Sequence, residues 1–247
     1  MKQANMHVMI RRLLRKLGID FSYAIVGKSL YGAIQTEANY SPWNADAAFL
    51  ECYRRIQNYT MVDRFRLWEL WDSVRQLTRV KGDILEVGTW RGGSGVLMGV
   101  AARLSGHTEP VWLCDTFTGI PRSSERDPNY KGGEHSDCSA DNVRKLAKTM
   151  NTSVSLLEGI YPDVTGEKGP QVIKLAHIDV DVYESVKKVF EYIWPRMVPG
   201  GMVLFDDYGF MGADGVRQYV DETIKFNAAT VVYNLNGHAV LVKTQAE

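Results

Sequence analysis

Residues 84–95 read Ile-Leu-Glu-Val-Gly-Thr-Trp-Arg-Gly-Gly-Ser-Gly, a short apolar run that leads into a cluster of glycines. Ile84–Val87 has the length and composition of a buried strand, and Val96–Leu104, beyond the glycines, has those of a helix. Glycine is favoured where a chain turns sharply between two such elements. The stretch therefore predicts one strand–turn–helix unit of an α/β fold.

The same alternation continues toward the C-terminus. Short apolar runs predict strands and helical spacing of apolar residues predicts helices, the strands at 111–114, 154–157, 172–180 and 202–205 and the helices at 63–77, 140–150, 183–194 and 215–226. Strands that alternate with helices form a mostly parallel, doubly wound sheet covered on both faces. Residues 230–233 and 239–242 have a link too short for a helical crossover, so they predict an antiparallel C-terminal hairpin.

Two segments fall outside this pattern. Residues 1–58 contain helix-like pieces, so we expect a helical N-terminal extension, for acceptor or oligomer contact, before a single domain over 59–247. The basic start of this extension fits an amphipathic arm packed on the domain or on a second subunit, with contact to a membrane interface as the alternative. Residues 119–137 are polar and longer than most connections, which favours a functional lid or a disordered segment.

The composition narrows the class of protein. Among 247 residues, 29 lysines and arginines balance 29 aspartates and glutamates, and a chain without basic excess is not expected to bind nucleic acid. Zero net charge also mildly favours a homo-oligomer. Cys52, Cys114 and Cys138 are odd in number and share no metal-ligand spacing, which indicates reduced thiols and a cytoplasmic protein. No stretch approaches the roughly 18 uncharged apolar residues that span a bilayer, so no membrane partner is expected.

Ligands of doubly wound sheets bind beyond the carboxyl ends of the strands, so the residues just after each strand are the candidate site residues. The turn after the first strand is not the G-x-G-x-x-G of dinucleotide-binding proteins, because Thr89-Trp90-Arg91 separates Gly88 from the next glycine. An acidic residue two positions before Gly88 and a glycine four after it are typical of S-adenosylmethionine-dependent methyltransferases.

Asp115 ends the second strand, where a carboxylate can accept hydrogen bonds from both ribose hydroxyls. The expected cofactor contacts near these two strand ends are Glu86, Gly88, Thr89, Arg91, Gly92, Ser94 and Asp115.

Four carboxylates follow the fourth and fifth strands: Asp179 and Asp181 in one case, Asp206 and Asp207 in the other. Gathered at one sheet edge without a cation, they would repel one another and their pKa values would rise. Oxygen ligands of this kind suit Mg²⁺ or another hard divalent cation. We expect Asp179, Asp206 and Asp207 at the metal, with Asp179 also near the cofactor. Strand alternation would put Asp181 on the same side as Asp179, as general base.

Other residues have weaker assignments. His135, in the polar loop, is the second candidate for the base and could orient the acceptor when the loop closes, although an exposed loop histidine is the simpler interpretation. Thr60 and Met61, at the opening of the first predicted helix, could contact the methionine end of the cofactor or serve only in capping. Trp90 and Tyr208 could line an acceptor pocket or belong to the core.

At these positions the chain resembles the macrocin O-methyltransferase family, which methylates sugar hydroxyls of macrolide and aminocoumarin natural products. The resemblance extends from about Thr60 to Lys243 and is carried by 86–93 (EVGTWRGG), 131–143 (KGGEHSDCSADNV), 178–185 (IDVDVYES), 199–201 (PGG) and 205–209 (FDDYG). It implies a class I methyltransferase fold, Asp179, Asp206 and Asp207 as magnesium ligands, and Asp181 as the base.

Two departures from the family bear on the acceptor. Val180 stands where the family usually has glycine, and the loop 119–130 looks different. Both lie where an acceptor would sit, so the resemblance does not carry the identity of the substrate.

The sequence therefore predicts an S-adenosylmethionine- and Mg²⁺-dependent O-methyltransferase that acts on a hydroxyl of a small molecule, expected to be a sugar or a glycosylated natural product. A catechol or another phenol is the alternative acceptor, because two adjacent hydroxyls on a ring would suit the same metal. The alternatives of another class are an NAD-type oxidoreductase, which lacks its fingerprint here, and a non-catalytic cofactor-binding module, which would leave the carboxylates without a role.

Overall fold

The computed structural model describes residues 30–31, 34, 38–121, 123–224 and 229–244. Residues 43–247 form one compact unit. The amphipathic arm expected in residues 1–34 lies almost entirely outside the described residues.

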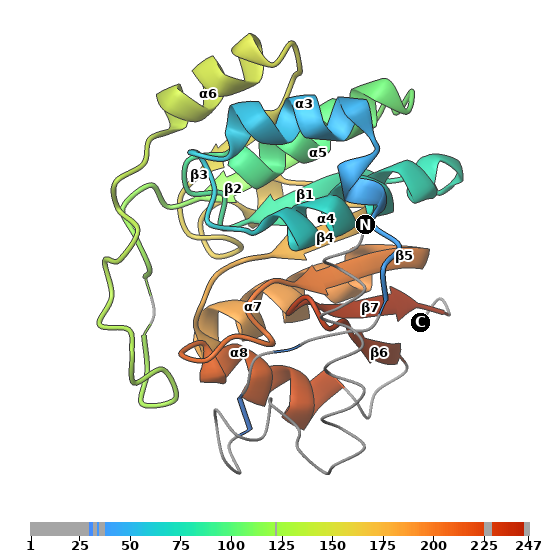
Figure 1. The fold of residues 1–247 in the computed structure, drawn as a ribbon. Helices are drawn as coiled ribbons and strands as arrows, with labels where there is room; N and C mark the ends of the chain where they lie inside the picture. The colour runs from blue at the N-terminus through green and yellow to red at the C-terminus, as the bar shows by residue number, and fades with distance from the viewer. Residues whose placement is uncertain (1–29, 32–33, 35–37, 122, 225–228, 245–247) are drawn as a thin grey trace, which may run out of the picture. The chain divides into compact units, whose positions relative to one another are not determined.

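The centre of this unit is a seven-stranded sheet in the order β3-β2-β1-β4-β5-β7-β6 (Figure 1). The first five strands along the chain pair in parallel, whereas β7 runs antiparallel to both β5 and β6. The predicted parallel sheet with a C-terminal antiparallel hairpin is thus confirmed. The strands are β1 (Asp83–Val87), β2 (Val111–Asp115), β3 (Ser155–Glu158), β4 (Ile173–Ile178), β5 (Met197–Phe205), β6 (Ala229–Tyr233) and β7 (Ala239–Lys243).

Helices cover the two faces of the sheet (Figure 1). One apolar core lies under α3 (Ala47–Ile56), α4 (Arg64–Gln76), α5 (Gly93–Leu104) and α6 (Ala140–Thr149). The other lies under α7 (Tyr183–Ile193) and α8 (Asp214–Tyr219). Short 3₁₀ turns complete the described helices, at Pro42–Asn44, Leu77–Arg79, Gly166–Lys168 and Trp194–Arg196.

Polar residues fix the start of three of these helices. Asp63 accepts hydrogen bonds from the first N–H groups of α4, and Asp46 does the same for α3. Ser139 accepts from Asn142 at the start of α6, as expected of a capping serine. Each cap satisfies an N–H that has no partner within its own helix.

The fourth strand is shorter and the fifth longer than predicted. β4 ends at Ile178, and Asp181 has a left-handed φ of 62°, so Asp179 and Asp181 lie beyond the strand and the alternation from which their common side was predicted does not extend to them. β5 begins at Met197 instead of residue 202, because the Pro-Gly-Gly segment at 199–201 is included in the strand, where the pairing with β4 shifts its register.

Two further segments differ from expectation. The last helix is α-helical only to Tyr219 and continues as a π-helical turn, Val220–Ile224, while residues 225–228 lie outside the described part. The structure describes the polar loop at 119–137 apart from residue 122. Ile120 donates its N–H to the Glu134 carbonyl, and Gly133 donates its N–H to the Ile120 carbonyl. The Gly-, Pro- and Ser-rich composition of the loop disfavours helix and strand, and its backbone groups bond to one another within the loop instead.

The domain boundary expected at residue 58 stays a prediction. Part of the expected extension is α3, whose Phe49, Cys52 and Ile56 are buried in the first core. Within the described residues, no helix is both long enough and apolar enough to cross a bilayer.

Among the described glycines, Gly88 has the least room for a side chain. Its φ is 91°, and an added Cβ would lie 1.6 Å from the backbone oxygen of Asp179. Gly106 offers a matched comparison, since its φ is 75° but an added Cβ would meet nothing within 4 Å. Both substitutions to alanine incur the left-handed backbone strain, and only Gly88→Ala adds a collision between β1 and β4.

We therefore expect Gly106→Ala to lower the free energy of unfolding by about 1 kcal/mol. Gly88→Ala should lower it by roughly 1–3 kcal/mol more, or prevent folding. Denaturant unfolding of both variants without added ligand makes the comparison. Equal losses would show that the close approach of β1 to residue 179 is not a constraint.

Candidate active site

A cavity of roughly 720 Å³ opens at the carboxyl ends of the parallel strands. Its walls come from the turn after β1, the ends of β2 and β3, the segments after β4 and β5, and the loop at 119–135. This is the edge at which doubly wound sheets bind their ligands.

Most of the expected cofactor contacts line this cavity. Gly88, Thr89 and Ser94 form the wall after β1, and Thr60 and Met61 lie in the segment that precedes α4. Asp115 also lines the cavity, with its two carboxylate oxygens accepting the N–H groups of Trp90 and Phe117 at 2.7 Å each. Those hydrogen bonds fix the carboxylate and leave a lone pair on each oxygen for a ligand hydroxyl.

Three expected cofactor contacts lie away from the cavity wall. Glu86 is fully buried and accepts a 2.5 Å hydrogen bond from the Thr89 hydroxyl. Arg91 pairs with Asp137, and Gly92 is the residue that caps α5. Their direct contact with a cofactor stays a prediction, while their observed contacts support the turn that would hold one.

Among the wall residues that were missed from the sequence, two carry buried hydroxyls. Tyr161 and Ser185 line the cavity and are each only 4% exposed. Their hydroxyls are buried and have no hydrogen-bond partner within the described part of the chain. A buried hydroxyl without a partner is unfavourable, so a bound ligand is an obvious source of one. The strand-end rule would have found Tyr161 had it been applied to β3.

Asp179, Asp206 and Asp207 form what we call the acid cluster. Each offers a carboxylate oxygen within 4.8 Å of those of the other two. Burial and the neighbouring carboxylates raise the pKa of Asp179 well above its ordinary value, and the same causes raise the pKa of Asp207. Asp207 Oδ2 is moreover buried without a hydrogen-bond partner among the described residues.

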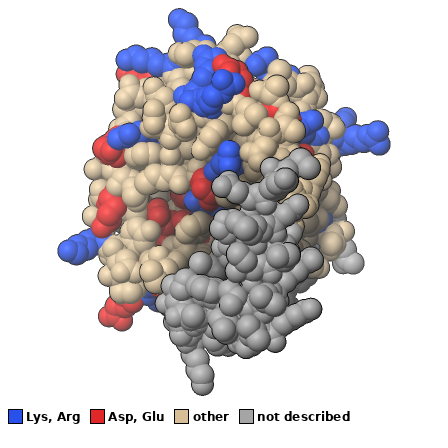
Figure 2. Space-filling view, viewed as in Figure 1, with Lys and Arg blue, Asp and Glu red and all other residues tan. Residues whose placement is uncertain are grey.

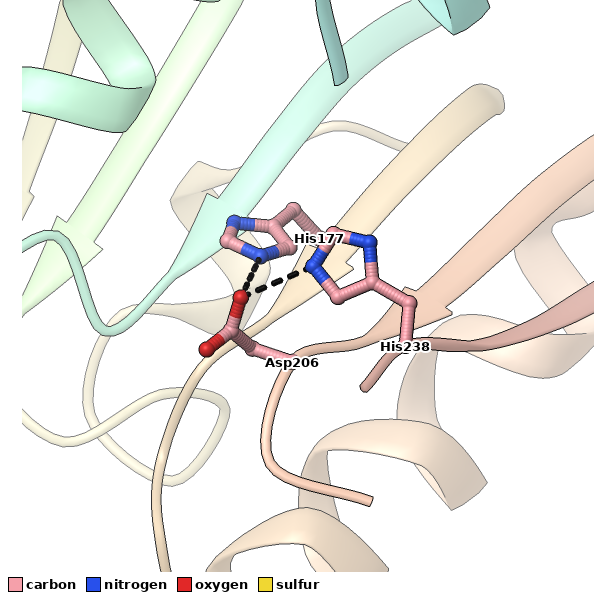
Figure 3. A group of neighbouring side chains, drawn as sticks. All are labelled: His177, Asp206 and His238. Atoms are coloured by element: carbon pink, nitrogen blue, oxygen red, sulfur yellow. Dashed lines mark hydrogen bonds and ion pairs between the residues drawn. The ribbon is translucent and has the colours of Figure 1, made fainter. Parts of the chain in front are cut away.

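Asp206 differs from the other two members of the cluster. Arg66 donates to its Oδ2, while the Nε2 atoms of His177 and His238 lie 3.2 and 2.8 Å from its Oδ1 (Figure 3). Burial alone would raise the pKa of Asp206, but these three partners outweigh it and hold the pKa well below the ordinary value.

The acid cluster fits a divalent cation. Asp206 has a lowered pKa, whereas Asp179 and Asp207 have raised pKa values because their charged forms are destabilised by burial and by one another. Asp207 Oδ2 also lacks a hydrogen-bond partner among the described residues. A ligand set made only of carboxylate oxygens suits Mg²⁺ or a similar hard ion. His177, Asp206 and His238 also bring metal-binding atoms within 4.8 Å of one another. Their ring nitrogens, however, are engaged by carboxylates on both sides, so hydrogen bonding accounts for that group without an ion.

Asp181 lies beside the acid cluster without being part of it. The Tyr130 hydroxyl donates a 2.8 Å hydrogen bond to its Oδ1, and both residues line the cavity. Burial raises the pKa of Asp181, and the Tyr130 hydrogen bond opposes that shift. A carboxylate with a raised pKa at a cavity wall is suited to accept a proton.

The other polar-loop candidate also reaches the cavity. His135 lines it, with its ring centroid 6.5 Å from that of Trp90. Trp90, His135 and Asp181 are three of the five non-glycine residues with left-handed φ in the described part of the chain. Backbone strain of this kind collects at functional sites, where the surrounding structure holds it in place.

The loop is anchored at the cavity by buried and half-buried contacts. Asp127, which is 1% exposed, accepts the Tyr183 N–H at the start of α7 and the Ser124 hydroxyl. An exposed hydrogen bond, from the Asn129 side chain to the Gly212 carbonyl, adds a further contact. In Figure 2, acidic atoms show in a hollow near the middle of the face, while lysines and arginines lie mostly around its rim.

Of the two aromatic residues considered for an acceptor pocket, Trp90 lines the cavity, whereas Tyr208 is buried in the second core.

Comparison with known proteins agrees with this geometry. Residues 38–233 match the model of the macrocin O-methyltransferase (TylF) family. The chain is 31% identical over 175 residues to the 8-demethyl-8-(2,3-dimethoxy-alpha-L-rhamnosyl)-tetracenomycin-C 4'-O-methyltransferase of Streptomyces olivaceus, covering 65% of this chain and 67% of that protein. It is 26% identical over 198 residues to the mycinamicin III 3''-O-methyltransferase of Micromonospora griseorubida, covering 71% and 78% of the two chains.

Among solved structures, the O-methyltransferase NovP superposes with a TM-score of 0.68 at 25% identity, over 76% of this chain and 83% of that one. The family match includes all the strand-end residues discussed above. The class I methyltransferase fold and the family resemblance predicted from the sequence are therefore confirmed. The chain belongs to the macrocin O-methyltransferase family and is an S-adenosylmethionine-dependent O-methyltransferase.

Proposed function

We propose that this enzyme methylates a sugar hydroxyl of a glycosylated natural product and requires a divalent cation, Mg²⁺ being the best fit. The observation that carries the proposal is the acid cluster, with its orphaned Asp207 oxygen, in the cavity that also holds the expected cofactor residues. Two relatives are named for methylation on a rhamnosyl group and at a 3'' position, which supports a sugar acceptor. A cytoplasmic location and a homo-oligomer stay predictions from the sequence.

Asp179, Asp206 and Asp207 would hold the cation. The cation would lower the pKa of an acceptor hydroxyl, which is otherwise a poor nucleophile at neutral pH. These aspartates and the loop residues Tyr130 and His135 line the same cavity, so the acceptor hydroxyl would be bound there, beside the cation.

Asp181 would remove the hydroxyl proton. As the acceptor oxygen forms its bond to the methyl carbon and the sulfur–methyl bond breaks, the proton passes to the Asp181 carboxylate and S-adenosylhomocysteine leaves. Tyr130 donates to Oδ1 of this carboxylate, which leaves Oδ2 to face the acceptor. His135 would orient the acceptor from the loop.

The cofactor would lie along the turn after β1. Asp115 would accept hydrogen bonds from the ribose hydroxyls of the cofactor, and Gly88, Thr89 and Ser94 would contact it from the turn after β1. Thr60 and Met61 would lie near its methionine end. The further contacts of Glu86, Arg91 and Gly92 would be indirect. Tyr161 and Ser185 would form hydrogen bonds to the cofactor through their buried hydroxyls, which have no partner among the described residues.

Removal of divalent cations tests the first part of the proposal. Treatment with EDTA should lower turnover by about a hundredfold or more, because a bound cation supplies several kcal/mol of charge stabilisation. Added Mg²⁺ should restore it. The measurement is transfer of a labelled methyl group to a panel of sugar and phenol acceptors. Full turnover after chelation would rule out the cation, and transfer only to phenols would rule out the sugar.

Substitution of Asp181 tests the base. Asp181→Asn still accepts the Tyr130 hydrogen bond but cannot take a proton at neutral pH, so turnover should fall by about 10²–10⁴-fold. Affinity for S-adenosylhomocysteine, measured by calorimetry, should not change. Glu184→Gln, on α7 outside the cavity wall, serves as the control and should retain turnover. If Asp181→Asn methylates at the normal rate, the base is another residue, with His135 the next to test.

The orphaned hydroxyl of Tyr161 gives a test of the cofactor site. Tyr161→Phe should weaken S-adenosylhomocysteine binding by roughly threefold to tenfold, the equivalent of one hydrogen bond. Stability of the free protein should not fall, because the removed hydroxyl has no partner there. Tyr192→Phe is the matched control, since the Tyr192 hydroxyl is also buried and unpartnered but does not line the cavity. Equal affinity in both variants would remove Tyr161 from the cofactor site.

A further inference from the structure

Behind the acid cluster, away from the cavity, lies a buried group of side chains that the proposed chemistry does not use. His238 is fully buried and does not line the cavity. It comes from the turn between β6 and β7, whereas Asp206 follows β5. Two charged or polar groups are not buried together without a specific interaction to offset their loss of solvent.

The two histidine rings approach Asp206 from different elements, β4 and the β6–β7 turn, and converge on one oxygen (Figure 3). His177 Nε2 lies 3.2 Å and His238 Nε2 lies 2.8 Å from Oδ1. A carboxylate oxygen has two lone pairs, so these two contacts occupy Oδ1 completely. Oδ2, which Arg66 also contacts, is the oxygen left for a cation.

Each ring is held in turn by a second carboxylate. His238 Nδ1 lies 2.6 Å from Glu69 Oε2, and Glu69 also accepts the side-chain amides of Asn234 and Asn236 at 2.6 and 2.7 Å. These contacts tie α4 to the β6–β7 turn and determine the rotation of the His238 ring. With Nδ1 facing Glu69, Nε2 is directed at Asp206.

We propose that His238 is a positioning residue of the cation site: its Nε2–H, aimed by Glu69, holds Asp206 Oδ1 and so keeps this carboxylate oriented beside Asp179 and Asp207. The proposal rests on the cation of the proposed function and extends it to residues that touch neither cofactor nor acceptor. Partners that orient the ligands of a metal commonly change its affinity by about 10–100-fold when they are removed. His177 contacts the same oxygen, but its other ring nitrogen bonds to Glu86, which supports the cofactor turn. A substitution of His177 would therefore disturb both proposed sites, whereas a substitution of His238 would affect only the cation site.

Two substitutions of His238 divide its two hydrogen bonds. The amide of glutamine reaches the position of Nε2, so His238→Gln keeps a donor at Asp206 and loses the one at Glu69. The amide of asparagine reaches the position of Nδ1, so His238→Asn keeps the donor at Glu69 and loses the one at Asp206. A role limited to filling the core would not distinguish these variants in this way.

The experiment is calorimetric titration of Mg²⁺ into the protein saturated with S-adenosylhomocysteine. His238→Asn should weaken Mg²⁺ binding by about tenfold or more, and His238→Gln by no more than about threefold. Affinity for S-adenosylhomocysteine should be the same in both variants and the unsubstituted enzyme. Equal Mg²⁺ affinity in His238→Asn and the unsubstituted enzyme, or equal weakening in both variants, overturns the proposal.

Glu69→Gln provides an independent variant, because the Glu69 side chain is 18% exposed and tolerates change better than the buried ring. It removes the charge that aims His238 and should weaken Mg²⁺ binding by about twofold to fivefold, again with unchanged S-adenosylhomocysteine affinity. Unchanged Mg²⁺ affinity in this variant contradicts the proposal even if the His238 variants do not fold. Absence of Mg²⁺ binding in the unsubstituted enzyme would instead refute the cation of the proposed function itself.

Discussion

The repulsion among Asp179, Asp206 and Asp207 is the constraint on which the rest of the site depends. Three carboxylates whose oxygens lie within 4.8 Å of one another are stable together only if their charge is compensated. The protein compensates Asp206 alone, through Arg66 and two histidines, and leaves Asp179 and Asp207 with raised pKa values. The asymmetry gives the cluster one fixed anion and two groups whose charge depends on what they bind.

The sheet brings these carboxylates together. β4 and β5 are parallel neighbours, so the residues that follow Ile178 and Phe205 leave the sheet at the same edge. On the other side of β4, β1 delivers Gly88 against the backbone of Asp179, which places the cofactor turn in direct contact with the first residue of the cluster. The proposed cofactor and cation sites are thus adjacent because two pairs of strands share β4.

Much of the fold and part of the site could be predicted from the sequence. Short apolar runs identified every strand, and the rule that ligands bind at strand ends identified Gly88, Asp115 and the four aspartates, because those signals are local in the chain. His177, His238 and Arg66 could not be found in this way. His177 lies inside an apolar strand and His238 in an ordinary turn, and their partners Glu86 and Glu69 are 91 and 169 residues away. The left-handed backbone of Asp181 was also beyond a rule based on strand alternation.

Two residues of the loop that carries Tyr130, only three positions apart, bond to the segment around the start of α7. Asp127 supplies the acceptor for the first N–H of α7, and Tyr130 supplies a donor to Asp181, just before that helix. The loop therefore cannot lift from the cavity as a rigid piece without exposing the start of α7 and releasing the Asp181 carboxylate in the same movement. A movement of this loop large enough to admit a bulky acceptor would therefore also change the hydrogen bonding of the carboxylate that is proposed to deprotonate it.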